Sequence, residues 1–182
     1  MNKRLLIIVG FATILFLSFY IGSPYFAANS LKNAAIAGDV DSLEAGVDFP
    51  AVQESLKAQM TVALMTEFKN DPKMQGNPFA GLGAMMMPAI IDRAVSSYVT
   101  PEGISALVKG AKPGQIEAAK NNSDIEFATD YSGLDRFRVH TSKRSNGEKG
   151  PTFLFERRGI FTWKMIKIEL PADFMKRGST PE

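Results

Sequence analysis

The sequence predicts an α+β fold: one N-terminal transmembrane helix, then a helical first half packed on one face of a four-stranded antiparallel β-meander. Three observations predict it. A charge-free apolar stretch lies near the amino terminus, apolar residues then recur every three or four positions, and after residue 123 they alternate with polar residues. We therefore divide the chain into an anchor at 1–22, one domain at 23–171 (helical at 23–123, sheet at 124–171), and a flexible tail at 172–182.

The charge-free stretch runs from Leu5 to Ile21, seventeen residues in all. As a helix it is about 26 Å long, close to the roughly 30 Å of a bilayer's hydrocarbon core. Lys3 and Arg4 precede it, and the next positive charge is Lys32. Because positive charge stays on the cytoplasmic side, we expect the amino terminus in the cytoplasm and the domain across the membrane.

A cleaved signal peptide is the alternative for this leader, since it shares the basic start and the apolar middle. Cleavage needs small residues at the −3 and −1 positions, whereas the exit GSPYFAANS contains Pro24, Tyr25 and Phe26. The sequence has no cysteine, which excludes a lipid-modified cysteine anchor. We therefore expect the leader to be retained.

Composition narrows the chemistry of the domain. Without cysteine there is no disulfide, no thiol chemistry and no thiolate metal site. Setting Lys3 and Arg4 aside from the 21 basic residues leaves 19, which equals the 19 acidic residues. A neutral domain gives no electrostatic basis for binding nucleic acid. We expect no nucleic-acid partner and no cofactor.

Capping residues mark the helices of the first half. Asp, Thr or Ser before the first turn bonds free backbone N–H groups, and glycine ends the last turn. The expected helices are 23–37 ended by Gly38, about 41–45 after Asp39 or Asp41, a long one from Asp48 to Asn70, 84–98 kinked at Pro88, and 100–108 capped by Thr100.

An uncharged run of thirteen residues, Phe79 to Ile91, is too short to span a bilayer, so we expect it in the core. It contains Met85, Met86 and Met87, whose thioethers suit Cu(I). Three consecutive side chains fan out around a helix, however, so packing is the better interpretation.

Strands are predicted where apolar and polar residues alternate between segments typical of turns. We expect strands at 125–131, 137–141, 152–157 and 161–170, with turns at 132–133, at Asn146–Gly147 and at 158–159. In the last strand the apolar residues move from the odd positions 161, 163 and 165 to the even positions 166, 168 and 170. This change of face predicts a β-bulge near Met165. Residues 110–114 and 121–123 are expected connectors.

Aromatic residues of the strands are the candidate ligand-binding residues. If the sheet curves, they could line an apolar pocket between sheet and helices, although a filled core is the default. The five residues that we assign to such a pocket are Phe127, Tyr131, Phe137, Phe153 and Trp163.

Other chemistry is weakly supported. His140 is the only histidine, and it falls on the polar phase of a strand, so we assign no catalytic residue. Asp39 and Asp41 lack the alternation of a calcium loop and are read as caps, so we assign no metal site. Basic residues around one hairpin are read as a charged rim rather than a site for an acidic partner: Lys143, Arg144, Lys149, Arg157 and Arg158.

Four blocks carry a resemblance to a known family: GSPYFAANSLKNAAIAGDVDSLEAGVDFPAVQESLKAQM, SSYVTPEGISALVKG, GLDRFRV and FLFERRGIFTWKMIKIELP. Together they resemble the bacterial family called domain of unknown function 2939. The resemblance implies a single-pass envelope protein and carries over no activity, cofactor or catalytic residue. The segment AIAGDVDSLEAGVDFP also resembles the opening of nuclear-transport-factor-2-like and cystatin-like domains, although fold does not give function.

We therefore expect a single-pass protein of the bacterial inner membrane whose periplasmic domain is a non-catalytic protein-interaction or scaffolding module. Its expected partners are the membrane and another envelope protein. The alternative is a small-molecule or lipid-binding domain that uses the aromatic pocket. An enzyme is the third alternative, and it would need acidic residues that converge in a pocket with His140 or Tyr131.

Overall fold

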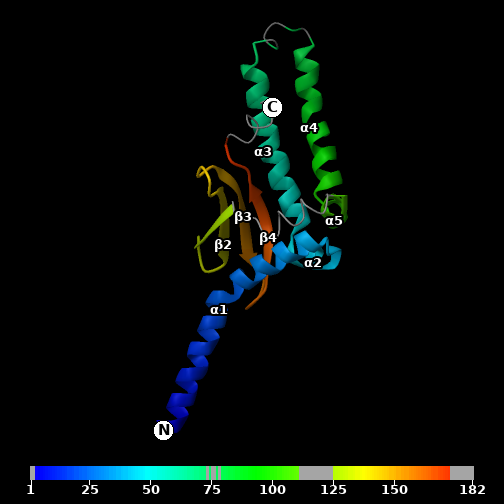
Figure 1. Cartoon of the computed structure of the whole chain (residues 1–182). Coiled ribbons are helices and arrows are strands. Elements are labelled where there is room, and N and C mark those ends of the chain that lie inside the picture. Colours follow the sequence, from blue (N-terminus) through cyan, green and yellow to red (C-terminus); the bar gives the residue numbers. More distant parts are fainter. Residues whose placement is uncertain (1–2, 73, 75–76, 78, 111–124, 173–182) are drawn as a thin grey trace.

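The structure, a computed structural model, describes residues 3–72, 74, 77, 79–110 and 125–172. In Figure 1 the helices of the first half lie beside a single sheet. The described elements are α1 (Lys3–Ala37), α2 (Val40–Gly46), α3 (Phe49–Asn70), α4 (Ala80–Tyr98), α5 (Pro101–Gly110), β1 (Ile125–Tyr131), β2 (Arg136–Lys143), β3 (Lys149–Arg157) and β4 (Trp163–Glu169). The expected connectors at 111–114 and 121–123, and the tail at 173–182, lie outside the described residues.

The sheet has the order β1-β2-β3-β4 with antiparallel pairing throughout, which confirms the predicted meander. One face of it packs against the helices. Phe137 is fully buried there, beside Phe155 and Met165, and the helices contribute Leu43 and Val52 to the same core. The α+β fold with helices on one sheet face is confirmed.

Local signals explain most element ends. Asp48 accepts from Ala51 N at 3.3 Å and caps α3, and Asp39 accepts from Ser42 N at 3.2 Å and caps α2. Gly147 has φ 69° in the β2–β3 turn, a conformation that favours glycine. The register of β3 against β4 shifts between Leu154 and Phe155, which confirms the bulge expected near Met165.

α1 is one continuous helix of 35 residues, where the sequence suggested an apolar leader followed by a separate Ala-rich helix. Its amino-terminal half projects away from the body, and α1 bends before its second half lies along the domain (Figure 1). It is long and apolar enough to cross a membrane, and its most apolar window is 0% buried. Gly38, at φ 64°, ends it as predicted.

Pro24 lies inside α1 and accounts for the bend, because proline has no N–H to donate to the carbonyl four residues earlier. That carbonyl belongs to Tyr20. Ser23 Oγ donates to it at 2.9 Å, and Trp163 Nε1 donates to Ser23 Oγ at 2.8 Å. Ser23, Pro24 and Trp163 are all buried, so this relay ties the bend of α1 to the start of β4.

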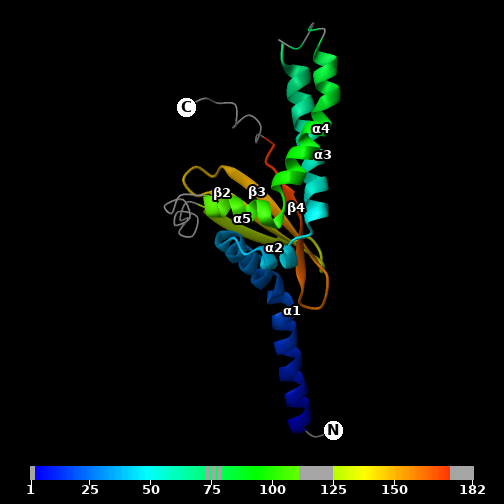
Figure 2. The same cartoon turned by 90° about the vertical axis from the view of Figure 1, so that its right-hand side faces the viewer.

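α3 and α4 form a hairpin that extends beyond the sheet, at the opposite end of the molecule from the amino terminus (Figure 2). The expectation that the run from Phe79 to Ile91 lies in the core is wrong, as only Ile91 is buried. The expectation that the three methionines pack is wrong for Met85 and Met86, which are 80% and 62% exposed. The reason is that α4 has α3 as its main neighbour, so one side of an apolar helix stays uncovered.

α4 also begins at Ala80 rather than at residue 84. Ala80 N donates to Asn77 O at 3.0 Å, so the first turn forms before Gly81 and Gly83, although glycine disfavours a helix. A Cβ added at Gly83 would lie 3.7 Å from the ring of Phe68, an ordinary packing distance, so α3 and α4 face each other at this level.

We predict that Ser23→Ala destabilises the domain by about 1–3 kcal/mol, because the buried indole N–H of Trp163 loses its acceptor. Denaturant unfolding of the full-length chain in detergent, followed by Trp163 fluorescence, measures the change. Ser30→Ala is the matched control, since Ser30 is an exposed serine of the same helix. Equal unfolding midpoints for the two variants would contradict the proposed relay.

Candidate functional site

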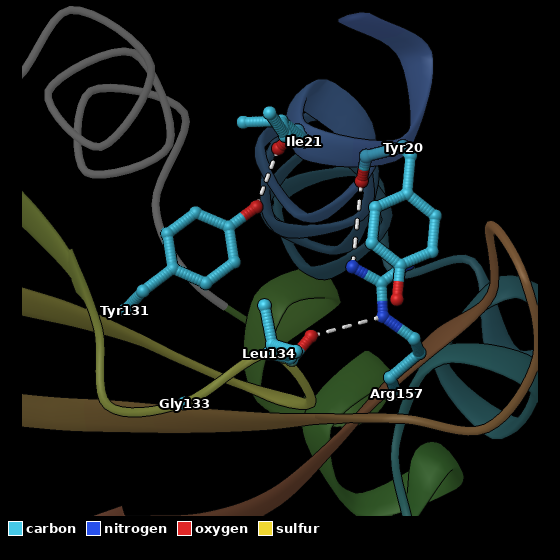
Figure 3. A pocket seen from close by; sticks show the side chains of 6 residues that line it. All are labelled: Tyr20, Ile21, Tyr131, Gly133, Leu134 and Arg157. Atoms are coloured by element: carbon cyan, nitrogen blue, oxygen red, sulfur yellow. Dashed lines mark hydrogen bonds between the residues drawn. The ribbon is translucent and has the colours of Figure 1, made fainter. Parts of the chain in front are cut away.

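An open groove lies where α1 meets one end of the sheet (Figure 3). The β1–β2 and β3–β4 turns both lie at this end, because alternate turns of an antiparallel meander lie at the same end of the strands. The groove has a volume of about 400 Å³. Its lining comes from α1, from the β1–β2 turn and from the two strands beside it: Tyr20, Ile21, Tyr131, Gly133, Leu134 and Arg157.

Arg157, the last residue of β3, holds the groove together. Its guanidinium lies 3.8 Å from the ring centroid of Tyr20 and 4.3 Å from that of Trp163. Its Nε donates to Leu134 O at 3.2 Å, Nη1 donates to Ile160 O at 2.5 Å, and Nη2 donates to Tyr20 O at 3.4 Å. One side chain therefore bonds both turns and the carbonyl that Pro24 leaves without an N–H.

The charge of Arg157 is not neutralised by a carboxylate among the described residues. A guanidinium has five N–H donors, so its three bonds to carbonyls leave one N–H on each of Nη1 and Nη2. A cation with free donors beside apolar walls can bind an anionic oxygen such as that of a phosphate group.

Tyr131 closes the other side of the groove, where its hydroxyl donates to Ile21 O (Figure 3). Burial raises the pKa of Tyr131 above its ordinary value, partly offset by the positive charge of Arg157. The phenol therefore remains protonated at neutral pH and remains a donor. Two side chains of the sheet thus bond successive carbonyls of α1, at Tyr20 and Ile21.

The five residues assigned to an aromatic pocket come from the same face of the sheet. Phe137 and Trp163 are buried core residues, and Tyr131 stacks edge-on against both, at 5.2 and 6.3 Å. Phe153 packs at the core boundary. Phe127 is 47% exposed, with Lys32 Nζ 5.0 Å from its ring. Only Tyr131 of the five lines the groove described above, and their role in binding a ligand stays a prediction.

His140 lies on the opposite, outer face of the sheet in a polar network. Its Nε2 is 2.6 Å from Asp130 Oδ1, and its Nδ1 is 3.1 Å from Thr152 Oγ1. Arg138 also donates to Asp130. An acid, an imidazole and a hydroxyl in sequence can activate a nucleophile, but acyl transfer also needs oxyanion donors and a substrate pocket. Asp130 and His140 each remain about two-fifths exposed on this face.

The basic residues expected around one hairpin do not gather. Lys143, Arg144 and Lys149 lie at the β2–β3 turn, whereas Arg157 and Arg158 lie at the far end of β3. The expectation is wrong because β3 itself separates the two groups. Within the described ranges, no group of three or more His, Cys, Asp or Glu side chains is placed to hold a metal ion.

Arg138, through its hydrogen bond, lowers the pKa of Asp130 below its ordinary value, and the hydrogen bond with His140 adds to this effect. A carboxyl with a depressed folded-state pKa stabilises the fold above its unfolded pKa, and the contribution is lost as the pH falls through the folded value. We predict that Asp130→Asn costs up to about 1 kcal/mol at pH 7, a small value because the pair is solvent-screened.

This cost should shrink as the pH falls below about 4, because the Asp130 carboxyl is protonated there in the unfolded chain and is protonated in the folded protein only at a lower pH. Unfolding curves between pH 7 and pH 3 measure it. Asp135→Asn is the control, since Asp135 is exposed and its carboxylate has no partner among the described residues. A cost for Asp130→Asn that does not change with pH would contradict the electrostatic account.

Comparison with known proteins identifies a family. Residues 13–107, just over half of the chain, match the family described as protein of unknown function DUF2939, which confirms the resemblance. No curated protein matches the chain. No solved structure matches it either. The matched region contains most of α1, all of α2, α3 and α4, and most of α5. The chain therefore belongs to the DUF2939 family.

Proposed function

We propose that this chain is a single-pass membrane protein whose periplasmic domain binds another envelope protein and does not catalyse a reaction. The observation that carries the binding role is the uncovered apolar side of α4, which the fold holds at the end of the domain away from the amino-terminal half of α1 (Figure 1). The membrane role is supported by the apolar first half of α1.

Retention of the leader is supported by the way α1 enters the core. Ser23 and Pro24 are buried, and the ring of Tyr25 lies 4.8 Å from that of Phe137. Cleavage after Ala28 would remove these three residues and would expose the face of the sheet that they cover. A signal peptide is cleaved off and contributes nothing to the mature domain, whereas residues 23–25 pack against this one.

Topology gives a direct test of the anchor. We predict that alkaline phosphatase fused after Glu182 is active and that a green fluorescent protein in the same place is dark, because the carboxyl end is periplasmic. We also predict that the membrane-extracted chain retains its original amino terminus. The same fusions without residues 2–22 are the control and should reverse both readouts. A fluorescent full-length fusion, or a mature chain that begins after Ala28, would contradict the proposal.

The binding surface is the outer stripe of α4, which consists of Leu82, Met85, Met86 and Ile90. These residues are 60–80% exposed and recur at steps of three and four, so they lie on one side of the helix. Phe79, 73% exposed, extends the stripe at its start. A contiguous apolar surface on a soluble domain marks an interaction site, and methionine adapts its shape to a partner.

The end of the stripe indicates the kind of partner. Arg93 follows on the same side of α4, and it makes no ion pair with a described residue. Two parallel copies of α4, both anchored in one membrane, would bring Arg93 against its own counterpart, which is unfavourable. A non-identical amphipathic helix that carries an acidic residue opposite Arg93 suits the surface better.

A photocrosslinking amino acid at position 85 of the full-length chain tests this surface in native membranes. We predict one discrete adduct with a second protein, and we predict that Arg93→Glu in the same chain abolishes it through charge repulsion. The matched control places the crosslinker at Glu67, an exposed residue of α3 at a similar height in the hairpin.

Three results would contradict the proposed partner. They are an adduct of twice the chain's own mass, equal adducts from positions 67 and 85, and no adduct at position 85. The first would make the stripe a self-association surface, and the last would favour the lipid-binding alternative.

That alternative, a small-molecule or lipid site, is supported by the groove at α1 rather than by the five aromatic residues, because the groove combines apolar walls with the cation of Arg157. The enzyme alternative would use Asp130, His140 and Thr152 on the outer face. Kinship with nuclear-transport-factor-2-like or cystatin-like folds stays a prediction.

A further inference from the structure

The β3–β4 turn lies beside the apolar half of α1. The ring of Phe161 contacts the ring of Phe16 edge-on, with 5.7 Å between centroids. Phe16 is inside the charge-free stretch that ends at Ile21, five residues later. At 1.5 Å per residue, Phe16 lies about 7.5 Å deeper along the helix than Ile21.

The membrane boundary cannot be moved below Phe16. The stretch from Leu5 to Leu15 is about 16 Å long as a helix, roughly half of the hydrocarbon core that a spanning helix must cross. Even the whole stretch to Ile21 is slightly short. If α1 spans the bilayer, then Phe16 is inside it, and so is the loop residue that packs on Phe16.

The composition of the turn suits this position. Residues 159–162 are Gly-Ile-Phe-Thr and have no charge. Ile160 is 60% exposed and Phe161 is 46% exposed, and neither residue belongs to the hydrophobic core. Leu134, on the neighbouring β1–β2 turn, is 82% exposed at the same end of the sheet. These three apolar side chains occupy the two turns that flank α1.

Four backbone carbonyls of the two turns accept hydrogen bonds from the protein, as a segment near hydrocarbon requires. Arg157 Nη1 and Nε donate to the carbonyls of Ile160 and Leu134. Arg158 N donates to Thr162 O at 2.9 Å, and Arg157 N donates to Asp135 O at 2.8 Å. The carbonyls of Leu134, Asp135, Ile160 and Thr162 therefore have protein donors.

We propose that this end of the domain is a second membrane contact: Ile160 and Phe161 insert into the leaflet next to the domain, and Leu134 rests in its headgroup layer. The proposal depends on the anchor proposed above. Asp135 keeps the β1–β2 turn at headgroup depth, because a carboxylate resists transfer into hydrocarbon. Arg157, held between Tyr20 and Trp163, lies at the level where its free N–H groups meet lipid phosphates.

Because the chain has no cysteine, single-cysteine variants of the full-length protein can be labelled at one chosen site. The probe is a nitrobenzoxadiazole dye in vesicles of phosphatidylethanolamine and phosphatidylglycerol. Separate vesicle samples contain lipids spin-labelled near the top or near the middle of the acyl chain. Ile160→Cys and Leu134→Cys test the two turns. Phe11→Cys reports the anchor, and Arg144→Cys reports the far end of the sheet.

We expect blue-shifted emission and lipid quenching at positions 160 and 11, with the shallow spin label the stronger quencher at 160 and the deep label the stronger quencher at 11. We expect weaker quenching at position 134 and none at position 144. If position 11 is quenched while positions 160 and 134 behave like position 144, the insertion is wrong and the anchor stands. If position 11 is itself unquenched, the anchor fails and the insertion fails with it. Unchanged Trp163 emission verifies that each labelled domain is folded, and the two turn positions are independent of one another.

Discussion

The carbonyl of Tyr20 is the constraint on which the rest of the structure depends. Pro24 deprives it of its helical donor, and a backbone carbonyl withdrawn from water must find another. Ser23 and Arg157 supply that donor. Ser23 in turn binds Trp163 at the start of β4, and Arg157 stands at the end of β3. Satisfying one helix carbonyl therefore fixes the bend of α1 against the end of the sheet.

This junction also explains why the groove exists. Arg157 spreads its donors over two turns and one helix, so the three segments meet around a charged group and cannot collapse into a purely apolar contact. The aromatic rings of Tyr20 and Trp163 cover its two faces. The result is a polar centre with apolar rims, and such an amphipathic end is suited to a membrane surface.

Much of the fold was predictable because its signals are local. Asp48 with Pro50 marks the start of α3, Asn146–Gly147 marks a turn, and the change of phase near Met165 marks a bulge, each through the chemistry of a few neighbouring residues. The exposure of α4 was not predictable, since an apolar run does not reveal how many elements surround it. The continuity of α1 was also missed, because Pro24 in sequence resembles an exit from the membrane.

The candidate site was predictable only in part. The turns at 132–133 and 158–159 lie at the same end of the strands in any four-stranded meander. The sequence therefore contained the signal that brings Leu134 and Arg157 together. Instead, nearness in sequence grouped Arg157 with Lys149, although a strand of nine residues separates their ends by roughly 26 Å. Tyr20 and Ile21 could not be added, because periodicity does not say which edge of the sheet a helix will meet.

The absence of a linker between α1 and the domain has a mechanical consequence. If α1 is anchored in lipid as proposed, a continuous helix holds the domain at a fixed height, whereas a flexible linker would let it sample many heights. α3, with 22 residues, adds about 33 Å of further reach. With the proposed anchor in place, the tip of the hairpin would stand at one fixed distance from the bilayer, and its contacts would be restricted to molecules that reach that distance.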